Sequence, residues 1–324
     1  MPWLAGIDEA GYGPNLGPFV MTVMACHIAD IEGEVDLWKR LKHAVRRKKD
    51  RDDGRILVED SKVVYTSKKG LKSLERGVMS AVAPDALLNE QATSLQLAQW
   101  LPDVCPGGVL NLQEECWYCG DTKLPVAMEL PGIAVAANMF RKISSDNGVR
   151  WAAARSVIVC PPRFNALLER WGSKAIVLLV SLAELLQSVM QLQPAEPVHI
   201  FVDKHGGRNF YGDVLRQSLP GGTIEPVEQG EERSIYNIAG LDRECTITFQ
   251  TKADKDHFNV ALASMLAKYL REVLMSEFNR FWKSHIPDLK PTAGYPVDAA
   301  RFINAIRPKM KELQIAEEAL WRKR

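Results

Sequence analysis

The stretch that decides the fold lies near the start of the chain and reads Gly6-Ile7-Asp8-Glu9-Ala10-Gly11-Tyr12-Gly13-Pro14-Asn15-Leu16-Gly17-Pro18. Apolar runs with residues suited to strands flank its turn-forming part, at 3–8 and 19–28. The glycines, prolines and asparagine between those runs must turn the chain. The stretch therefore predicts a β-hairpin whose first strand ends on two adjacent carboxylates, Asp8 and Glu9.

Two further carboxylates follow short apolar strands. Asp203 comes directly after 198–202, and Asp254 comes soon after 246–249. Strand ends at one edge of a mixed sheet are where such folds assemble sites. Adjacent residues of a regular strand point to opposite faces, so Asp8 and Glu9 can share a site only where their strand breaks. The Gly/Pro stretch that follows them supplies this break, and we expect all four carboxylates to meet.

Crowded carboxylates point to a bound cation. Unpaired acids that lie together repel one another and lose hydration, so such a cluster is stable chiefly when divalent ions neutralise it. Oxygen ligands of this kind suit Mg²⁺ or Mn²⁺. Two ions about 4 Å apart can activate a water and stabilise the leaving oxygen of a phosphodiester. The alternative is that these acids are solvated turn or capping residues, as Asp256 is expected to be at the N-cap of the next helix.

The rest of the chain predicts an α/β protein. Helical spacing runs through Leu71, Leu74, Val78 and Val82 after a start at Ser67, and again over about five turns from Phe258. Residues 86–160 look inserted, and 164–190 regain an amphipathic helical pattern. We expect a catalytic domain over 1–285, with that insertion, and a helical C-terminal extension over 286–324.

Composition sets the class of protein. The chain has 324 residues, of which 46% are hydrophobic and 25% charged, and this argues against disorder and against a disulfide scaffold. The net charge of +1 offers no global field for a polyanion, so nucleic-acid binding must rest on local patches. Neither a signal segment nor a membrane span is recognisable, and we expect a cytoplasmic location, no membrane partner and a monomer.

The six cysteines lack the spacing of a secreted framework and are expected to be reduced. Only the pair Cys116 and Cys119 has the spacing of a metal or redox site. A zinc ion needs two more ligands, so incidental thiols are the other interpretation of this pair.

Five sequence blocks resemble the ribonuclease HII family. The opening stretch is similar to the family's G-[IV]-D-E-[AV]-G-R-G-P-x-x-G motif, and Asp60-Ser61-Lys62 is similar to its D-S-K-K-L-S segment. Phe201-Val202-Asp203 looks like the strand that ends in the family's third catalytic Asp. Lys252-Ala253-Asp254 with the helix after it resembles the family's K-G-D and I-A-A-A-S-I-L-A-K, and Gly294-Tyr295-Pro296 its G-Y-[PG]-T.

This resemblance implies a ribonuclease H-like mixed five-stranded sheet flanked by helices. It further implies metal-dependent endonucleolytic hydrolysis of the RNA strand of RNA–DNA hybrids, with 5′-phosphate and 3′-hydroxyl ends. The implied catalytic and metal-binding residues are Asp8, Glu9, Asp203 and Asp254, which would hold two ions, Mg²⁺ or Mn²⁺. Contacts to the nucleic acid are expected from Gly11, Tyr12, Gly13, Lys62, Lys268 and Tyr295.

The chain departs from the family pattern at Tyr12. There the family has the basic residue of G-R-G, in the backbone-built element that reads the ribonucleotide 2′-hydroxyl. Lys204 and His205 also stand where the family usually has Gly-Asn, and His205 is either a proton shuttle or an unpartnered turn histidine. Two rival functions remain open at this point: a nuclease of the same fold that acts on structured DNA or another substrate, and a non-catalytic nucleic-acid-binding module.

Overall fold

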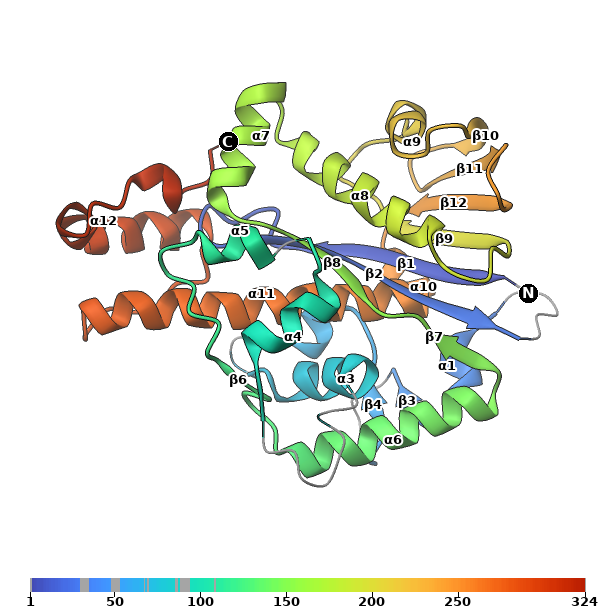
Figure 1. Ribbon diagram of the computed structural model, residues 1–324, viewed down its shortest axis with the longest axis horizontal. Coiled ribbons are helices and arrows are strands. Elements are labelled where there is room, and N and C mark those ends of the chain that lie inside the picture. Colours follow the sequence, from blue (N-terminus) through green and yellow to red (C-terminus); the bar gives the residue numbers. More distant parts are fainter. Residues whose placement is uncertain are drawn as a thin grey trace.

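The structure, a computed structural model, describes residues 2–29, 35–47, 53–66, 68, 70–84, 87, 94–107 and 109–323. An eight-stranded sheet lies at its centre (Figure 1). The strand order is β10–β11–β12–β9–β1–β2, and both β7 and β8 pair with β2 at the far side. The strands are β1 (Trp3–Ala10), β2 (Phe19–Ile28), β7 (Val149–Trp151), β8 (Arg155–Val159), β9 (Val198–Asp203), β10 (Thr223–Gln229), β11 (Arg233–Ala239) and β12 (Cys245–Gln250).

Strand direction within the sheet is mixed. β1 pairs antiparallel with β2, in register from Trp3 opposite His27 to Ala10 opposite Val20, which confirms the predicted hairpin. The expected break directly after the two carboxylates is wrong, because regular pairing with β2 carries the strand on to Ala10, and Asp8 and Glu9 are adjacent residues within β1. β9 pairs parallel with β1 on one side and with β12 on the other. Because parallel strands end at the same edge of a sheet, the carboxyl ends of β1, β9 and β12 lie together. This arrangement brings the three predicted acidic segments to one edge.

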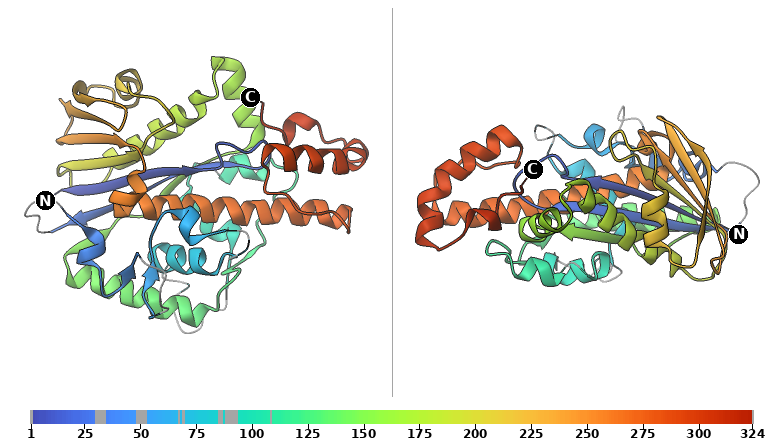
Figure 2. Two further views of the ribbon diagram at one scale, coloured as in Figure 1. Left: turned by 180° about the vertical axis from the view of Figure 1, so that it is seen from behind. Right: turned by 90° about the horizontal axis from the view of Figure 1, so that it is seen from above.

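Helices cover both faces of the sheet. One face packs on α7 (Pro161–Trp171), α8 (Ala175–Met190) and α9 (Gly212–Ser218), and the other on α11 (Phe258–His285), α3 (Lys72–Val82) and α6 (Leu130–Asp146). Figure 2 shows α11 as the long helix that runs along its face of the sheet, with α12 (Pro296–Glu312) beside its C-terminal end. The mixed α/β architecture with a helix-flanked sheet is therefore confirmed. The sheet has eight strands rather than five, because the β10–β11 hairpin extends it beyond β12 and because β7 and β8 divide the far edge between them.

The smaller elements lie mainly in the first half of the chain. They are α1 (Leu37–Arg40), β3 (Val45–Arg46), β4 (Ile56–Leu57), α2 (Ser61–Val64), β5 (Leu95–Gln96), α4 (Leu97–Val104), α5 (Val109–Gln113), β6 (Lys123–Leu124), α10 (Ala253–Asp256) and the 3-10 turn η2 (Glu317–Ala319). Residues 86–160 thus carry helices α4 to α6 together with β7 and β8, two strands that join the main sheet. Residues 286–324 carry α12 and η2, after which Trp321 returns to pair with Leu16.

Several local expectations change in detail. The helical pattern over 164–190 is split in two, because Gly172 takes a φ of 68° and ends α7, and α8 leaves at an angle of 108°. Asp256 is not an N-cap: His257 holds that position of α11, and Asp256 accepts a hydrogen bond from Gln250 Nε2 at 2.6 Å. The expected helix after Ser67 is α3, and Ser67 itself lies outside the described residues.

The six cysteines are all free thiols, with Cys116 and Cys119 exposed. Within the described ranges, no group of three or more His, Cys, Asp or Glu side chains is arranged to hold a metal ion, so the pair has no zinc set around it there. Among the described helices, none is by itself long and apolar enough for a membrane span, and only α7 and α8 taken together across their bend pass that test.

Gly6 sets the distance between β1 and α11. A Cβ atom added to Gly6 would lie 2.2 Å from the backbone nitrogen of Val260 and 2.3 Å from the carbonyl carbon of Asn259. Asn259 fastens the same contact, because its Nδ2 donates to Leu4 O at 2.7 Å. The helix backbone therefore lies directly against the strand, two residues before Asp8.

We expect Gly6→Ala to lower the free energy of unfolding by about 3 kcal/mol, because a methyl group there must push backbone atoms apart in a packed core. Chemical denaturation of the variant and the wild type measures the change. Gly207→Ala is the matched control, since a Cβ at Gly207 meets no atom within 4 Å. Equal stability of Gly6→Ala and the wild type would show that α11 does not pack this closely on β1.

Candidate active site

The four predicted carboxylates form one group at the sheet edge. Asp8 belongs to β1 and is 7% exposed, and its Oδ1 accepts the N–H of Glu9 at 2.7 Å. Asp203 is the last residue of β9, and its Oδ1 accepts the N–H of Ala253 at 2.9 Å. That bond ties the end of β9 to the first turn of α10, where Asp254 lies. Lys252, in the left-handed region at φ 57°, turns the chain from β12 into α10.

Burial and neighbouring negative charges raise the pKa of these carboxyl groups. Burial raises the pKa of Asp8 well above its usual value, and the charges of Glu9 and Asp203 raise it further. Burial and then Asp203 raise the pKa of Glu9 to about 7. Burial raises the pKa of Asp254 to about 6, with added repulsion from Asp60 and Asp203. Asp203 is therefore the carboxylate whose charge acts on each of the other three.

Asp60 is a fifth member that the sequence analysis did not assign. Its charge raises the pKa of both Asp203 and Asp254, so its carboxylate lies near theirs. It is the N-cap of α2, and its side chain accepts the N–H of Lys62 at 2.8 Å. The sequence does carry a signal for Asp60, since this carboxylate follows the short apolar strand β4 just as Asp203 follows β9.

Serine hydroxyls hold the buried side of the cluster. Ser264, on α11, hydrogen-bonds the carboxylate of Asp8, and its Oγ lies 3.0 Å from Oγ of Ser61. Both serines are buried. The contact links α2, α11 and β1 behind the carboxylates, so the orientation of Asp8 depends on the packing of α11.

Lys62 is a cation beside three of the carboxylates, and Lys255 is a second one beside Asp254. The charge of Lys62 lowers the pKa of Glu9, Asp203 and Asp254, and its side chain is exposed. Lys268, by contrast, is occupied inside the protein: its Nζ lies 2.6 Å from Glu272 Oε1 and 4.9 Å from the ring centre of Tyr65. Of the two predicted lysines, the structure brings Lys62 to the carboxylates and gives Lys268 a partner on its own helix.

The predicted substrate loop lies beside the cluster. Tyr12 is half-buried, and Lys174 Nζ stands 4.6 Å from the centre of its ring. Burial and the charge of Glu9 raise the pKa of Tyr12, and Arg208 opposes them. Gly11 takes a φ of 87°, and a Cβ on Gly13 would lie 4.0 Å from the ring of Tyr295. Tyr295 is 53% exposed and lies beside Gly13.

His205 is buried behind Asp203. Within the described part of the chain, neither of its ring nitrogens has a hydrogen-bond partner. Burial and the charge of Arg208 lower its pKa to about 4, which keeps the ring neutral. The structure thus places it as an unpartnered turn histidine, one of the two interpretations of the sequence.

The donor chemistry of the cluster fits a divalent cation. Glu9 Oε2 is buried and has no hydrogen-bond partner among the described residues, and a buried oxygen of this kind needs a cation or a proton. The side chains are not set as a finished ligand group, since no such set occurs among the described residues.

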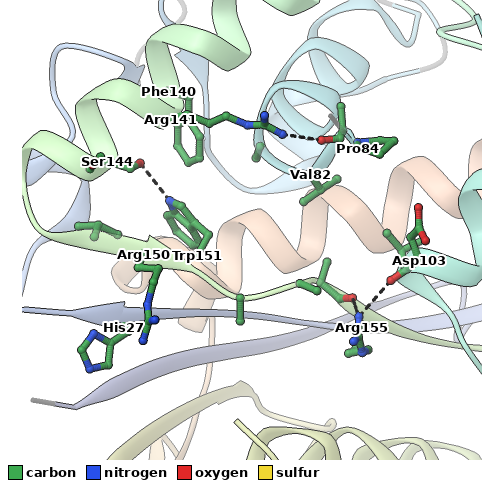
Figure 3. Close-up of a pocket in the computed structure, with 18 of the residues that line it drawn as sticks. His27, Val82, Pro84, Asp103, Phe140, Arg141, Ser144, Arg150, Trp151 and Arg155 are labelled. Atoms are coloured by element: carbon green, nitrogen blue, oxygen red, sulfur yellow. Dashed lines mark hydrogen bonds between the residues drawn. The ribbon is translucent and has the colours of Figure 1, made fainter. Parts of the chain in front are cut away.

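The surface also has a cavity that lies away from the carboxylates. It has a volume of about 980 Å³ and lies among α3, α4, α6 and β7 (Figure 3). Its polar groups already have partners in the chain: Arg141 Nη2 donates to Ala83 O at 2.8 Å, and Arg155 Nη1 to Asp103 O at 3.0 Å. None of the four predicted carboxylates lines this cavity, so it is not part of the candidate site.

Residues 185–318 match the ribonuclease HII family model. The resemblance to the ribonuclease HII family is confirmed. The matched segment contains Asp203, Asp254, Lys268 and Tyr295, and the opening motif with Asp8 and Glu9 lies before it. The match supports a ribonuclease H-type nuclease, a hydrolase that acts on nucleic acid, and members of this family use divalent metals. No curated protein matches the chain.

Solved structures of ribonuclease H enzymes are similar to this chain. Ribonuclease HII from Archaeoglobus fulgidus, determined in complex with PCNA, shares 16% identity at a TM-score of 0.42, over 99% of this chain and 94% of that one. Ribonuclease H2 from Pyrococcus horikoshii OT3 shares 16% identity at a TM-score of 0.41, over 98% and 92%. Ribonuclease H3 from Aquifex aeolicus shares 14% identity at a TM-score of 0.40, over 98% and 70%.

The raised pKa of Glu9 predicts how the free energy of unfolding depends on pH when a chelator keeps the protein free of metal. A carboxyl group whose folded pKa is raised favours the fold while it is protonated, so its contribution is complete below about pH 4.5 and is lost as the pH rises through about 7. Glu9→Gln keeps the shape without the charge. At about pH 8 the variant should therefore be more stable than the wild type, by on the order of 2–3 kcal/mol.

The measurement is urea denaturation in EDTA at several pH values between about pH 4 and 8. The two proteins should have similar stabilities at the acid end and diverge toward the alkaline end. Parallel profiles across that range would contradict the burial of a repelled carboxylate at Glu9.

Proposed function

We propose that this protein is a metal-dependent endonuclease that hydrolyses the RNA strand of RNA–DNA hybrids in the cytoplasm. The observation that carries the proposal is that Asp203, at the end of β9, raises the pKa of Asp8, Glu9 and Asp254, which come from two other segments at the same edge of the sheet. A binding module has no need of carboxylates that repel one another. A hydrolase that uses cations needs them, because they are the ligands that hold the cations. The family match over 185–318 supports the same class of chemistry.

Asp8, Glu9, Asp203 and Asp254 are the residues that would hold two Mg²⁺ or Mn²⁺ ions. Such ions, when bound, activate a water and stabilise the leaving oxygen of a phosphodiester. The chain itself supplies the orientation. Ser264 holds Asp8, and the Ala253 N–H holds Asp203, so neither carboxylate has to be ordered when a substrate arrives.

The proposed reaction is a hydrolysis. The oxygen of water forms a bond to phosphorus, and the bond from phosphorus to the 3′ oxygen breaks. The departing oxygen ends as a 3′-hydroxyl after it takes up a proton, and the attacking water, having lost a proton to solvent, becomes part of a 5′-phosphate. Lys62 lies where a cation can meet the negative charge of the strand that is cut.

Tyr12 bears on which duplex the proposed nuclease prefers, because it replaces the basic residue of the family motif. A phenol can stack or form one hydrogen bond, but it cannot pair with a phosphate as a cation does. We therefore propose a continuous RNA–DNA hybrid as the preferred substrate, ahead of a duplex with a single ribonucleotide. A duplex with a single ribonucleotide and an all-DNA duplex are the substrates with which the hybrid is compared.

Asp254→Asn should abolish cleavage of a continuous hybrid while the fold is kept, because an amide loses the charge that holds a cation. Asp256→Asn is the matched control: it lies two residues away on α10 and hydrogen-bonds Gln250. Initial rates in Mg²⁺ and in Mn²⁺, on hybrid and on all-DNA duplex, measure the effect. Wild-type turnover by Asp254→Asn in saturating Mg²⁺ would overturn the metal assignment, and absence of cleavage by the wild type would leave the binding-module function.

Tyr12→Arg should shift preference toward a duplex with a single ribonucleotide, since it restores a charged hydrogen-bond donor worth roughly 1–3 kcal/mol. Tyr12→Phe separates the loss of the hydroxyl from the gain of charge. The quantity to compare is the ratio of kcat/KM on the two substrates. An unchanged ratio in Tyr12→Arg would show that this position does not read the junction.

A further inference from the structure

The last residues of the chain fasten the loop between β1 and β2. Arg322 Nη1 donates to Gly11 O at 2.7 Å, and Arg322 N donates to Asn15 O at 2.8 Å. Asn15 Nδ2 returns a bond to Arg322 O at 3.1 Å. Leu16 and Trp321 add an antiparallel bridge. Residues 320–323, which we name the C-terminal strap, therefore bind the loop through both backbone and side chain.

The strap is itself anchored at its other side. Asn165, on α7 and 5% exposed, donates through Nδ2 to Trp321 O at 2.9 Å and to Glu318 O at 3.1 Å. Its Oδ1 accepts the N–H of Lys323 at 2.8 Å. One amide side chain thus fixes the strap against a helix that packs on the sheet, and the chain end is held in place.

The guanidinium of Arg322 is costly to bury. The side chain is 1% exposed, lies 5.0 Å above the ring of Phe164, and has Arg271 rather than an acid as a charged neighbour. Burial and Arg271 lower its pKa to about 9. Its Nε and Nη2 have no hydrogen-bond partner in the described part of the chain. Gly11 O is the hydrogen-bond acceptor that the structure gives this charge. Burial of a cation without an acidic partner costs stability.

The bond to Gly11 O determines how the next peptide group points. A peptide unit is planar and trans, so its N–H and C=O point in opposite directions. Because the Gly11 carbonyl points toward the buried Arg322, the Tyr12 N–H of the same unit points away from Arg322. Gly11, at φ 87°, has the conformational freedom of glycine, so the bond from Arg322 restricts how this peptide unit can turn.

We propose that Arg322 is a positioning residue that holds the Gly11–Gly13 loop in the shape that receives the nucleic-acid strand, and that the C-terminal strap completes this surface. The inference rests on the proposed function, since it concerns the substrate of the same site. Arg322 acts through Gly11 and does not touch the substrate. Loss of its charge should therefore weaken recognition of the strand while the carboxylates keep their affinity for cations.

Arg322→Met tests the proposal, with Arg307→Met as control, an arginine of the same extension that pairs with Glu317 at the surface. We expect the Kd for hybrid, measured in Ca²⁺, to rise at least tenfold in Arg322→Met. The preference for hybrid over all-DNA duplex should fall toward one, and Mn²⁺ affinity should stay unchanged. Arg322→Lys should restore part of the preference, because an ammonium can still donate to Gly11 O. Wild-type affinity and preference in a folded Arg322→Met would overturn the proposal.

Asn165→Ala provides a second test that leaves Arg322 itself in place and removes only an anchor of the strap, so it covers the case in which Arg322→Met does not fold. It should raise the Kd for hybrid several-fold, and an unchanged Kd would refute the strap. Hydrogen exchange of the amides over 11–16 needs no nucleic acid: it should quicken about tenfold in both variants and not in Arg307→Met. If the wild type fails to bind any nucleic acid, the proposed function fails, and unchanged exchange would by itself refute the strap.

Discussion

The close approach of α11 to β1 at Gly6 is the constraint on which the site depends. With no side chain at Gly6, the backbone of Asn259 and Val260 lies directly on the strand. Asp8 is two residues further along β1, and Ser264 is one turn further along α11, so the two meet. The start of α11 also determines where α10 lies, and with it Asp254. A larger residue at this one position would displace the helix that carries Ser264 and that directly follows the segment of Asp254.

The buried acids of this protein fall into two kinds. Glu75 accepts the N–H groups of Val126 and Ala127 and the hydroxyl of Tyr269, so its charge is compensated inside the core. Glu277 is satisfied in the same way by donors of the segment 119–122. Glu9, in contrast, keeps a buried oxygen without a partner in the described residues, next to charges of its own sign. An uncompensated carboxylate costs stability, which is the expected signature of a residue kept for chemistry.

The site is assembled from segments that are far apart in the chain. The loop that follows Glu9 is held by Arg322, and Gly294 O accepts the N–H groups of Asn15 and Leu16 at 2.7 and 3.2 Å. The extension after α11 thus packs against the turn of the first hairpin, close to the predicted contacts at Gly13 and Tyr295. The C-terminal region is therefore in direct contact with the opening motif.

Local sequence was enough to determine the hairpin, α3, α11, the two carboxylates on the first strand, Asp203 at the end of β9 and Asp254 soon after β12, because turn residues and apolar spacing act over a few positions. The tertiary structure alone decided which charges meet. Asp60 joins Asp203 and Asp254, Lys268 pairs with Glu272, and Arg322 holds Gly11 across most of the chain length. Such contacts depend on how whole strands and helices pack, since a side chain's partner at long range is set by the three-dimensional path of the backbone and leaves no periodic trace in the residues beside it.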